Sequence, residues 1–112
     1  MLDPVAGSLE RYMDLLATRQ KLVASNIANA ETPGYRTQDI DFEREFRSLV
    51  DGAQPRAVEV TGLEVNHDGN NVNLDREARM LAENGLRFQV AEALLKSELT
   101  EMRQAISGGG SG

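Results

Sequence analysis

Apolar residues in the first part of the chain recur at alternating steps of four and three. Eight of the nine positions in this row are apolar, and Gln20 is the exception. A heptad stripe sustained over four repeats is typical of a helix that pairs with another helix. Residues 1–30 are therefore predicted to form a long N-terminal helix. The row consists of Leu2, Ala6, Leu9, Met13, Leu16, Gln20, Val23, Ile27 and Ala30.

The same spacing returns in the last third of the chain. Asn73 precedes this second row and is a suitable N-cap, with acidic residues Asp75 and Glu77 in the first turn, where the helix dipole favours negative charge. Residues 73–106 are therefore predicted to form a C-terminal helix. The row consists of Leu74, Ala78, Leu81, Gly85, Phe88, Glu92, Leu95, Leu99, Met102 and Ile106.

Both stripes are narrow, which suits a coiled-coil seam better than the broad apolar face of a globular helix. The two helices are expected to pack on each other or on helices of neighbouring subunits, and packing completed by neighbours is favoured because aromatic residues make up only 4% of the chain. Gln20 and Glu92 interrupt the stripes, either to set register or as solvent-facing positions. The residues expected to pack are Leu9, Met13, Leu16, Val23, Ile27, Leu74, Leu81, Phe88, Leu95, Leu99, Met102 and Ile106.

The middle region, residues 31–72, has mixed patterns. Pro33 and Gly34 suit the two central positions of a type II turn, which ends the first helix. Residues 40–50 have a weak helical pattern, and 57–61 and 63–65 resemble short strands. Residues 107–112 have the composition of a flexible linker-like tail. The expected fold is mainly α, with long terminal helices pairing as a coiled coil and a loop-rich middle containing short strand segments.

Composition excludes several functions. The 112-residue chain has a net charge of −6, which disfavours nucleic acid as a partner, and it has no stretch apolar enough to insert into a membrane. It has no cysteine and a single histidine, so it lacks the usual ligand sets for a metal site. Acidic residues 39–51 have no nucleophile or phosphate-binding loop beside them, and a solvated or intersubunit face is the favoured interpretation. No enzyme activity and no cofactor are expected.

Two segments carry a family resemblance. Residues 25–36 read Ser-Asn-Ile-Ala-Asn-Ala-Glu-Thr-Pro-Gly-Tyr-Arg, which resembles the N-terminal signature of the bacterial flagellar rod and hook family. Residues 70–89 resemble the C-terminal signature of its proximal rod members, and the chain is too short for the inserted domains of hook and distal-rod members. The expected assembly motif is Asn26, Ile27, Asn29, Thr32, Pro33, Gly34, Tyr35 and Arg36.

The resemblance implies a structural subunit of the proximal rod that polymerises through its terminal helices and forms part of the torque-transmitting drive shaft. It also implies export by the flagellar type III apparatus without a cleaved signal peptide, and a place in the periplasmic rod of the basal body. The implied partners are copies of the chain itself, other flagellar rod subunits, the adaptor FliE and the export gate. The alternative is a soluble coiled-coil adaptor that binds a partner helix without forming a helical assembly.

Overall fold

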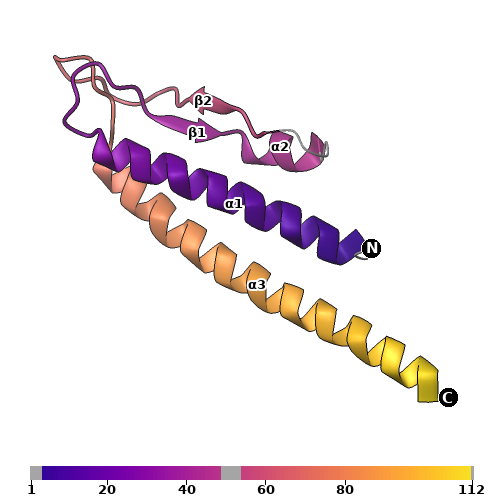
Figure 1. Ribbon diagram of the computed structural model, residues 1–112. Coiled ribbons are helices and arrows are strands. Elements are labelled where there is room, and N and C mark those ends of the chain that lie inside the picture. Colours follow the sequence, from indigo (N-terminus) through magenta and orange to yellow (C-terminus); the bar gives the residue numbers. More distant parts are fainter. Residues whose placement is uncertain (1–3, 49–53, 112) are drawn as a thin grey trace.

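The computed structural model describes residues 4–48 and 54–111 of the chain. In this part of the chain the elements are α1 (Pro4–Ala28), β1 (Gln38–Ile40), α2 (Phe42–Ser48), β2 (Ala57–Glu59) and α3 (Leu74–Ser111). The molecule is elongated, measuring 70 × 25 × 18 Å (Figure 1). The mainly α fold with long terminal helices and a small sheet in the middle is confirmed.

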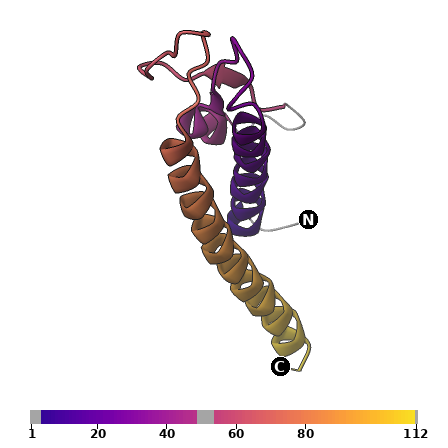
Figure 2. The same cartoon turned by 90° about the vertical axis from the view of Figure 1, so that its left-hand side faces the viewer.

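The two long helices form an antiparallel hairpin. Figures 1 and 2 show α3 running back along α1 from the turn end and continuing well beyond the start of α1. A third layer, made of α2 and the β1–β2 ribbon, covers the other side of α1 (Figure 1). The predicted pairing of the terminal helices is therefore present within a single chain.

Local sequence signals explain most of the helix boundaries. The Asn73 side-chain oxygen accepts a hydrogen bond from the Arg76 amide at 3.0 Å, as expected of an N-cap. At its other end α3 continues through Ser111, beyond the predicted end at residue 106 and into the predicted linker-like tail. Each residue added to an existing helix gains a backbone hydrogen bond, and this gain opposes the low helix propensity of glycine.

The middle region contains one short antiparallel ribbon. β1 pairs with β2 in the register Gln38 to Glu59, Asp39 to Val58 and Ile40 to Ala57. The second strand is shorter than the predicted 57–61, and residues 63–65 form no strand, because β1 is only three residues long and offers no further pairing partner. The predicted helical pattern over 40–50 corresponds to α2, and its last two residues lie outside the described part of the chain.

Aromatic contacts attach α2 to α1. The ring of Tyr12 meets the rings of Phe42 and Phe46 edge-on, at centroid distances of 5.2 and 5.9 Å. The Arg19 guanidinium lies 5.1 Å from the centroid of the Phe42 ring. Such T-shaped and cation–π pairs each contribute on the order of 1 kcal/mol. These contacts fix the third layer to the N-terminal half of the hairpin.

The core is thin and unusually polar. Buried apolar residues in the described chain are Ala6, Leu15, Leu16, Val23, Ile40 and Ala91. The buried polar residues are more numerous: Asn26, Thr37, Asp39, Glu45, Asn70, Asn71, Glu77 and Asn84. Hydrogen bonding between polar side chains thus has to replace much of the apolar packing of an ordinary domain.

The surface of α3 that is buried against α1 differs from the predicted row. Its fully or nearly buried residues are Glu77, Asn84 and Ala91, whereas the predicted row lies on one flank. The apolar pattern could not reveal this because Glu77 and Asn84 are buried with hydrogen-bond partners. Of the residues expected to pack, Leu16 and Val23 are buried, Leu9, Met13, Phe88, Leu95 and Met102 are half-buried, and Ile27, Leu74, Leu81, Leu99 and Ile106 are exposed.

Candidate assembly site

The turn after α1 has the predicted geometry. The Tyr35 amide donates to the Thr32 carbonyl at 3.2 Å, and Gly34 has a φ of 77°, as the third position of a type II turn requires. The Gly34 amide also donates to the Asp68 carbonyl at 2.9 Å. The turn is thereby tied to the loop that leads into α3.

Asn26 joins four segments of the chain. Its side-chain nitrogen donates to the Gln38 carbonyl at 2.9 Å and to Glu77 Oε1 at 2.7 Å. Its side-chain oxygen accepts from the Gln38 amide at 3.0 Å and from the Tyr35 hydroxyl at 2.9 Å. A single buried amide therefore connects α1, the turn, β1 and α3, and all of its hydrogen-bonding capacity is used within the chain.

Asn29 closes the end of α1. Its side-chain nitrogen donates to the Ser25 carbonyl at 2.9 Å, and its side-chain oxygen accepts from the Thr32 hydroxyl at 3.0 Å. The Ser25 carbonyl also accepts from the Asn29 amide at 3.0 Å, so Asn29 binds the last turn of α1 through both its backbone and its side chain. Asn29 thus has a local role, whereas Asn26 reaches across the fold.

Two further asparagines dock the loop before α3 onto the turn. The Asn70 side-chain nitrogen donates to the carbonyls of Asn29 and Thr32 at 2.9 and 2.7 Å. The Asn71 side-chain oxygen accepts from the Thr37 amide at 2.6 Å. The two family-like segments, residues 25–36 and 70–89, therefore contact each other directly.

A cluster of four charges lies beside Asn26, and we call Arg19, Asp39, Arg76 and Glu77 the buried charge cluster. Asp39 accepts from Arg19 Nε at 3.0 Å and from Arg76 Nη2 at 2.7 Å. Arg76 Nη1 lies 2.6 Å from Glu77 Oε2. Two positive and two negative groups alternate, so no member of the cluster is left without an opposite charge.

Burial lowers the pKa of Arg76, but its hydrogen bonds to Glu77 and Asp39 and the charges of both carboxylates outweigh this, and the pKa is raised above its ordinary value. The guanidinium therefore stays charged. The sequence pattern does not indicate this cluster, because Asp39 belongs to an acidic stretch that favours a solvated or intersubunit face. Glu77 lies within the family-like segment 70–89, whereas Asp39 lies between the two family-like segments.

The hairpin also contains a polar pair at its seam. The Asn84 side-chain nitrogen donates to the Leu16 carbonyl at 2.8 Å and to Gln20 Oε1 at 3.0 Å. This contact forms in only one register of the two helices, which fits the register-setting role considered for Gln20. Glu92 lies instead on the surface, where its Oε1 is 3.3 Å from Lys96 Nζ.

The remaining motif residues divide into two groups. Tyr35 and Arg36, expected to contact an adjacent subunit, have partners within the chain: the Tyr35 hydroxyl bonds to Asn26, and Arg36 lies against Glu59 and the Gly69 carbonyl. Ile27, Thr32, Pro33 and Gly34 are exposed at the turn end of the hairpin. Arg36 is exposed as well, and the intermolecular role of all these residues stays a prediction.

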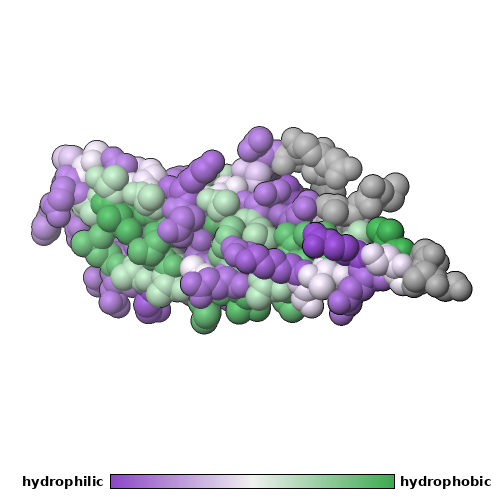
Figure 3. All heavy atoms as spheres, turned by 60° about the horizontal axis from the view of Figure 1, so that its bottom comes forward, coloured by the Kyte–Doolittle hydropathy of each residue, from purple (hydrophilic) through white to green (hydrophobic). Residues whose placement is uncertain are grey.

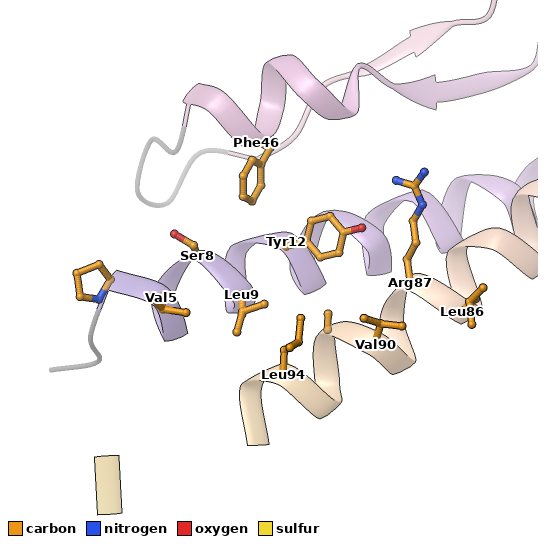
Figure 4. A pocket seen from close by; sticks show the side chains of 11 residues that line it. Val5, Ser8, Leu9, Tyr12, Phe46, Leu86, Arg87, Val90 and Leu94 are labelled. Atoms are coloured by element: carbon orange, nitrogen blue, oxygen red, sulfur yellow. The ribbon is translucent and has the colours of Figure 1, made fainter. Parts of the chain in front are cut away.

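An apolar groove of about 700 Å³ opens at the other end of the hairpin. Figure 4 shows Phe46 of α2 above α1, with Val90 and Leu94 of α3 directed toward the space between the helices. The Arg87 pKa is raised, chiefly by a hydrogen bond with Tyr12 at the groove wall. We call this space the apolar groove; it is lined by Pro4, Val5, Ser8, Leu9, Tyr12, Phe46, Leu86, Arg87, Val90, Ala91 and Leu94.

Green patches of hydrophobic residues alternate with purple, hydrophilic ones along the face drawn in Figure 3. Among the described residues, no group of three or more potential metal ligands comes together. None of the helices in this part of the chain is long and apolar enough to cross a membrane.

Comparison with known proteins defines the class. Residues 13–36, which contain the second half of α1 and the turn, match the family of flagella basal body rod proteins. The chain is 32% identical to the flagellar basal body rod protein FlgB of Salmonella typhimurium, covering 97% of this chain and 99% of the relative. It is 34% identical to FlgB of Cereibacter sphaeroides (84% and 87%) and 29% identical to FlgB of Escherichia coli K12 (97% and 99%).

The chain belongs to the FlgB family of flagellar basal body rod proteins. It is therefore a component of the flagellar basal body rod. The matched segment coincides with the part of the structure in which Asn26, Asn29 and the turn are held together.

Proposed function

We propose that this protein is a structural subunit of the proximal rod, and that it polymerises through its terminal helices into part of the torque-transmitting drive shaft. The observation that supports this most strongly is the apolar surface left uncovered on α3. Leu74 and Leu81 are exposed on one side of the row that meets α1, and Leu86, Val90 and Leu94 are exposed on the other. A helix with apolar residues on both flanks of its seam is suited to contact more than one additional helix.

Association would supply energy that the isolated chain lacks. Full burial of one Leu or Val side chain contributes about 1.5–3 kcal/mol, and the described chain buries only a few of them completely. Covering the exposed apolar residues of α3 with neighbouring subunits would multiply this contribution. The stability of the subunit would then depend on its assembly.

The turn end of the hairpin suits a part that carries torque. There, Asn26 and the buried charge cluster link α1, β1 and α3 through short, buried hydrogen bonds. Buried polar networks with every member paired hold segments in one arrangement. Force applied to one helix would therefore pass to the other without opening the hairpin.

The proposed partners follow from the family. They are further copies of the chain, other flagellar rod subunits, the adaptor FliE and the export gate. Export through the flagellar type III apparatus, without a cleaved signal peptide, would deliver the chain to the periplasmic rod. The proposed role is structural and needs no catalytic step.

Complementation tests the proposal in a strain that lacks its own proximal rod subunit. The chain is expected to restore swimming. A variant with Leu74→Glu and Leu81→Glu is expected to be exported but to give no rod, because both side chains are exposed and lie outside the subunit's own core. Arg79→Glu, on an exposed residue of the same helix, serves as the control and should leave swimming intact.

The adaptor alternative predicts a different result. An adaptor saturates its partner helix at a small closed stoichiometry, whereas a rod subunit makes contacts that do not close on themselves. If the chain fails to restore a rod in a compatible host and instead forms a small complex of fixed stoichiometry, the rod proposal is wrong.

A further inference from the structure

We propose, resting on the function above, that the apolar groove of one subunit receives the projecting C-terminal part of α3 from a second copy of the same chain. We call residues 95–108 of α3 the overhang. The proposal names both the occupant of the groove and the residues by which it is recognised. It concerns the end of the hairpin opposite the assembly motif.

Among the described residues, no other helix lies alongside the last turns of the overhang (Figure 1). Leu94 lines the groove together with Pro4 and Val5 at the start of α1, so the following residues of α3 run beyond the first described residue of α1 (Figures 1 and 2). Its apolar residues are partly or largely open to solvent, and Ile106 is 76% exposed. The apolar row on the flank of α3 therefore continues past the first described residue of α1.

The groove is open to solvent, and its apolar lining requires an apolar partner. Its walls come from α1, α2 and α3, and Val90 and Leu94 at its edge are 52% and 54% exposed. Its lining is dominated by aliphatic and aromatic side chains, with Ser8 and Arg87 as the polar members. A groove of this kind typically binds the apolar face of an amphipathic helix.

The overhang has the anchor spacing that this binding mode requires. Leu99, Met102 and Ile106 follow one another at steps of three and four, which places them on one face of the helix. At about 1.5 Å per residue, the stretch from 99 to 106 is about 10 Å long. The groove walls from 86 to 94 and from 4 to 12 each extend about 12 Å on the same basis. The overhang therefore matches the groove in length as well as in chemistry.

The overhang cannot fill the groove of its own chain. Val90 in the groove and Met102 in the anchor row lie on one continuous helix, about 18 Å apart along its axis. The occupant must be a different molecule, and the contact joins two different surfaces. Such a heterologous contact leaves one free groove and one free overhang at the ends of each pair, so it can continue from copy to copy.

A disulfide experiment tests this contact, because the natural chain has no cysteine. The double variant Val90→Cys with Met102→Cys is expressed in the complemented strain. Basal bodies are isolated and oxidised, and their proteins are separated by gel electrophoresis without reductant. Val90 lies midway along the α3 wall of the groove and Met102 lies midway along the anchor row, so the two cysteines are expected to meet whichever way the overhang runs. Covalent dimers and longer oligomers are expected. Val5→Cys with Met102→Cys tests the opposite wall in the same way.

The controls separate the possible outcomes. Gln89→Cys with Met102→Cys places one cysteine on an exposed residue outside the groove lining and should give no ladder. A dimer from Met102→Cys alone would indicate symmetric pairing of overhangs and overturn the proposal. Basal bodies that contain the chain but give no ladder with either groove pair, or that cross-link it only to another rod protein, would also overturn it while leaving the rod function intact. If the parent chain gives no basal bodies at all, the proposed function itself has failed.

Discussion

Asn26 and Glu77 are 51 positions apart in the sequence, yet Asn26 Nδ2 lies 2.7 Å from Glu77 Oε1, and both side chains are completely buried. This contact joins the end of α1 to the beginning of α3. Glu77 is held on its other side by Arg76, which also contacts Asp39 after the turn. The two long helices are thus connected at the turn end through charged and amide groups.

Asn26→Ala is expected to lower the free energy of unfolding by about 3 kcal/mol, because Glu77 Oε1 and the carbonyl and amide of Gln38 each lose a hydrogen bond at a buried site. Asn29→Ala should cost only about 1 kcal/mol, since its bonds are local to the helix end. Urea unfolding followed by circular dichroism measures both. Equal losses would show that Asn26 acts only as a local cap.

Arg76→Met is expected to cost about 3–5 kcal/mol, because it leaves two buried carboxylates without their shared cation. The control is Arg79→Met, three residues along the same helix. Arg79 is exposed and lies 3.9 Å from Asp75, so its loss should change stability by less than about 0.5 kcal/mol. Thermal unfolding of the two variants measures the difference. Similar melting temperatures would contradict the proposed contribution of the buried charge cluster to stability.

The raised pKa of Arg76 determines how the stability lost in Arg76→Met depends on pH. A raised pKa gives stability that is fully present below the ordinary arginine pKa and is lost only as the pH rises through the folded-state value. The stability difference between the parent and Arg76→Met is therefore expected to be constant from about pH 7 to about pH 10. A steady decline of the difference over this range would show that another group sets it.

Gly34→Ala is expected to destabilise the chain by about 1–2 kcal/mol, because its φ of 77° is strained for any residue with a Cβ, although no atom obstructs the added methyl group. Gly85→Ala is the matched substitution on α3, where space is also open and the backbone is helical. It should stabilise by about 0.5–1 kcal/mol. Changes of opposite sign in the free energy of unfolding, measured with urea, would support the turn geometry. No change in stability for Gly34→Ala would contradict it.

Asn84→Leu tests the polar pair at the seam. The side-chain oxygen of Asn84 is buried with no hydrogen-bond partner in the described part of the chain, so an apolar residue of similar size should raise stability by about 1 kcal/mol. The same change removes the bond to Gln20 that favours one register. A marked loss of stability on thermal unfolding would indicate that the bonds to Leu16 and Gln20 outweigh the unpaired oxygen.

Sequence reasoning located the long helices and the turn because their signals are local. The heptad rows, the Asn73 cap and the Pro33-Gly34 pair each depend on neighbouring residues, and the structure contains the corresponding elements. The composition of the glycine-rich tail predicts that the helix ends at residue 106, whereas α3 continues through Ser111. A long helix can extend into such a segment.

The buried charge cluster and the surface of α3 that is buried against α1 could not be predicted in the same way. The cluster depends on the folded approach of Asp39 to Arg76 and Glu77, and the buried surface of α3 includes the polar residues Glu77 and Asn84. An apolar pattern assigns charged residues to the surface, so Glu77 was expected only to favour the first turn of its helix. The apolar groove was also missed, because α2 contributes Phe46 to it from a segment with a weak pattern.

We propose that the chain is a building unit of the rod. The most direct test is to purify basal bodies from a strain in which this chain replaces the resident proximal rod subunit, and to probe the detergent-resistant rod fraction for the chain. A building unit of the rod is expected in that fraction together with the other rod proteins. Recovery of the chain only as a soluble complex of small, fixed stoichiometry, with no rod assembled, would contradict it.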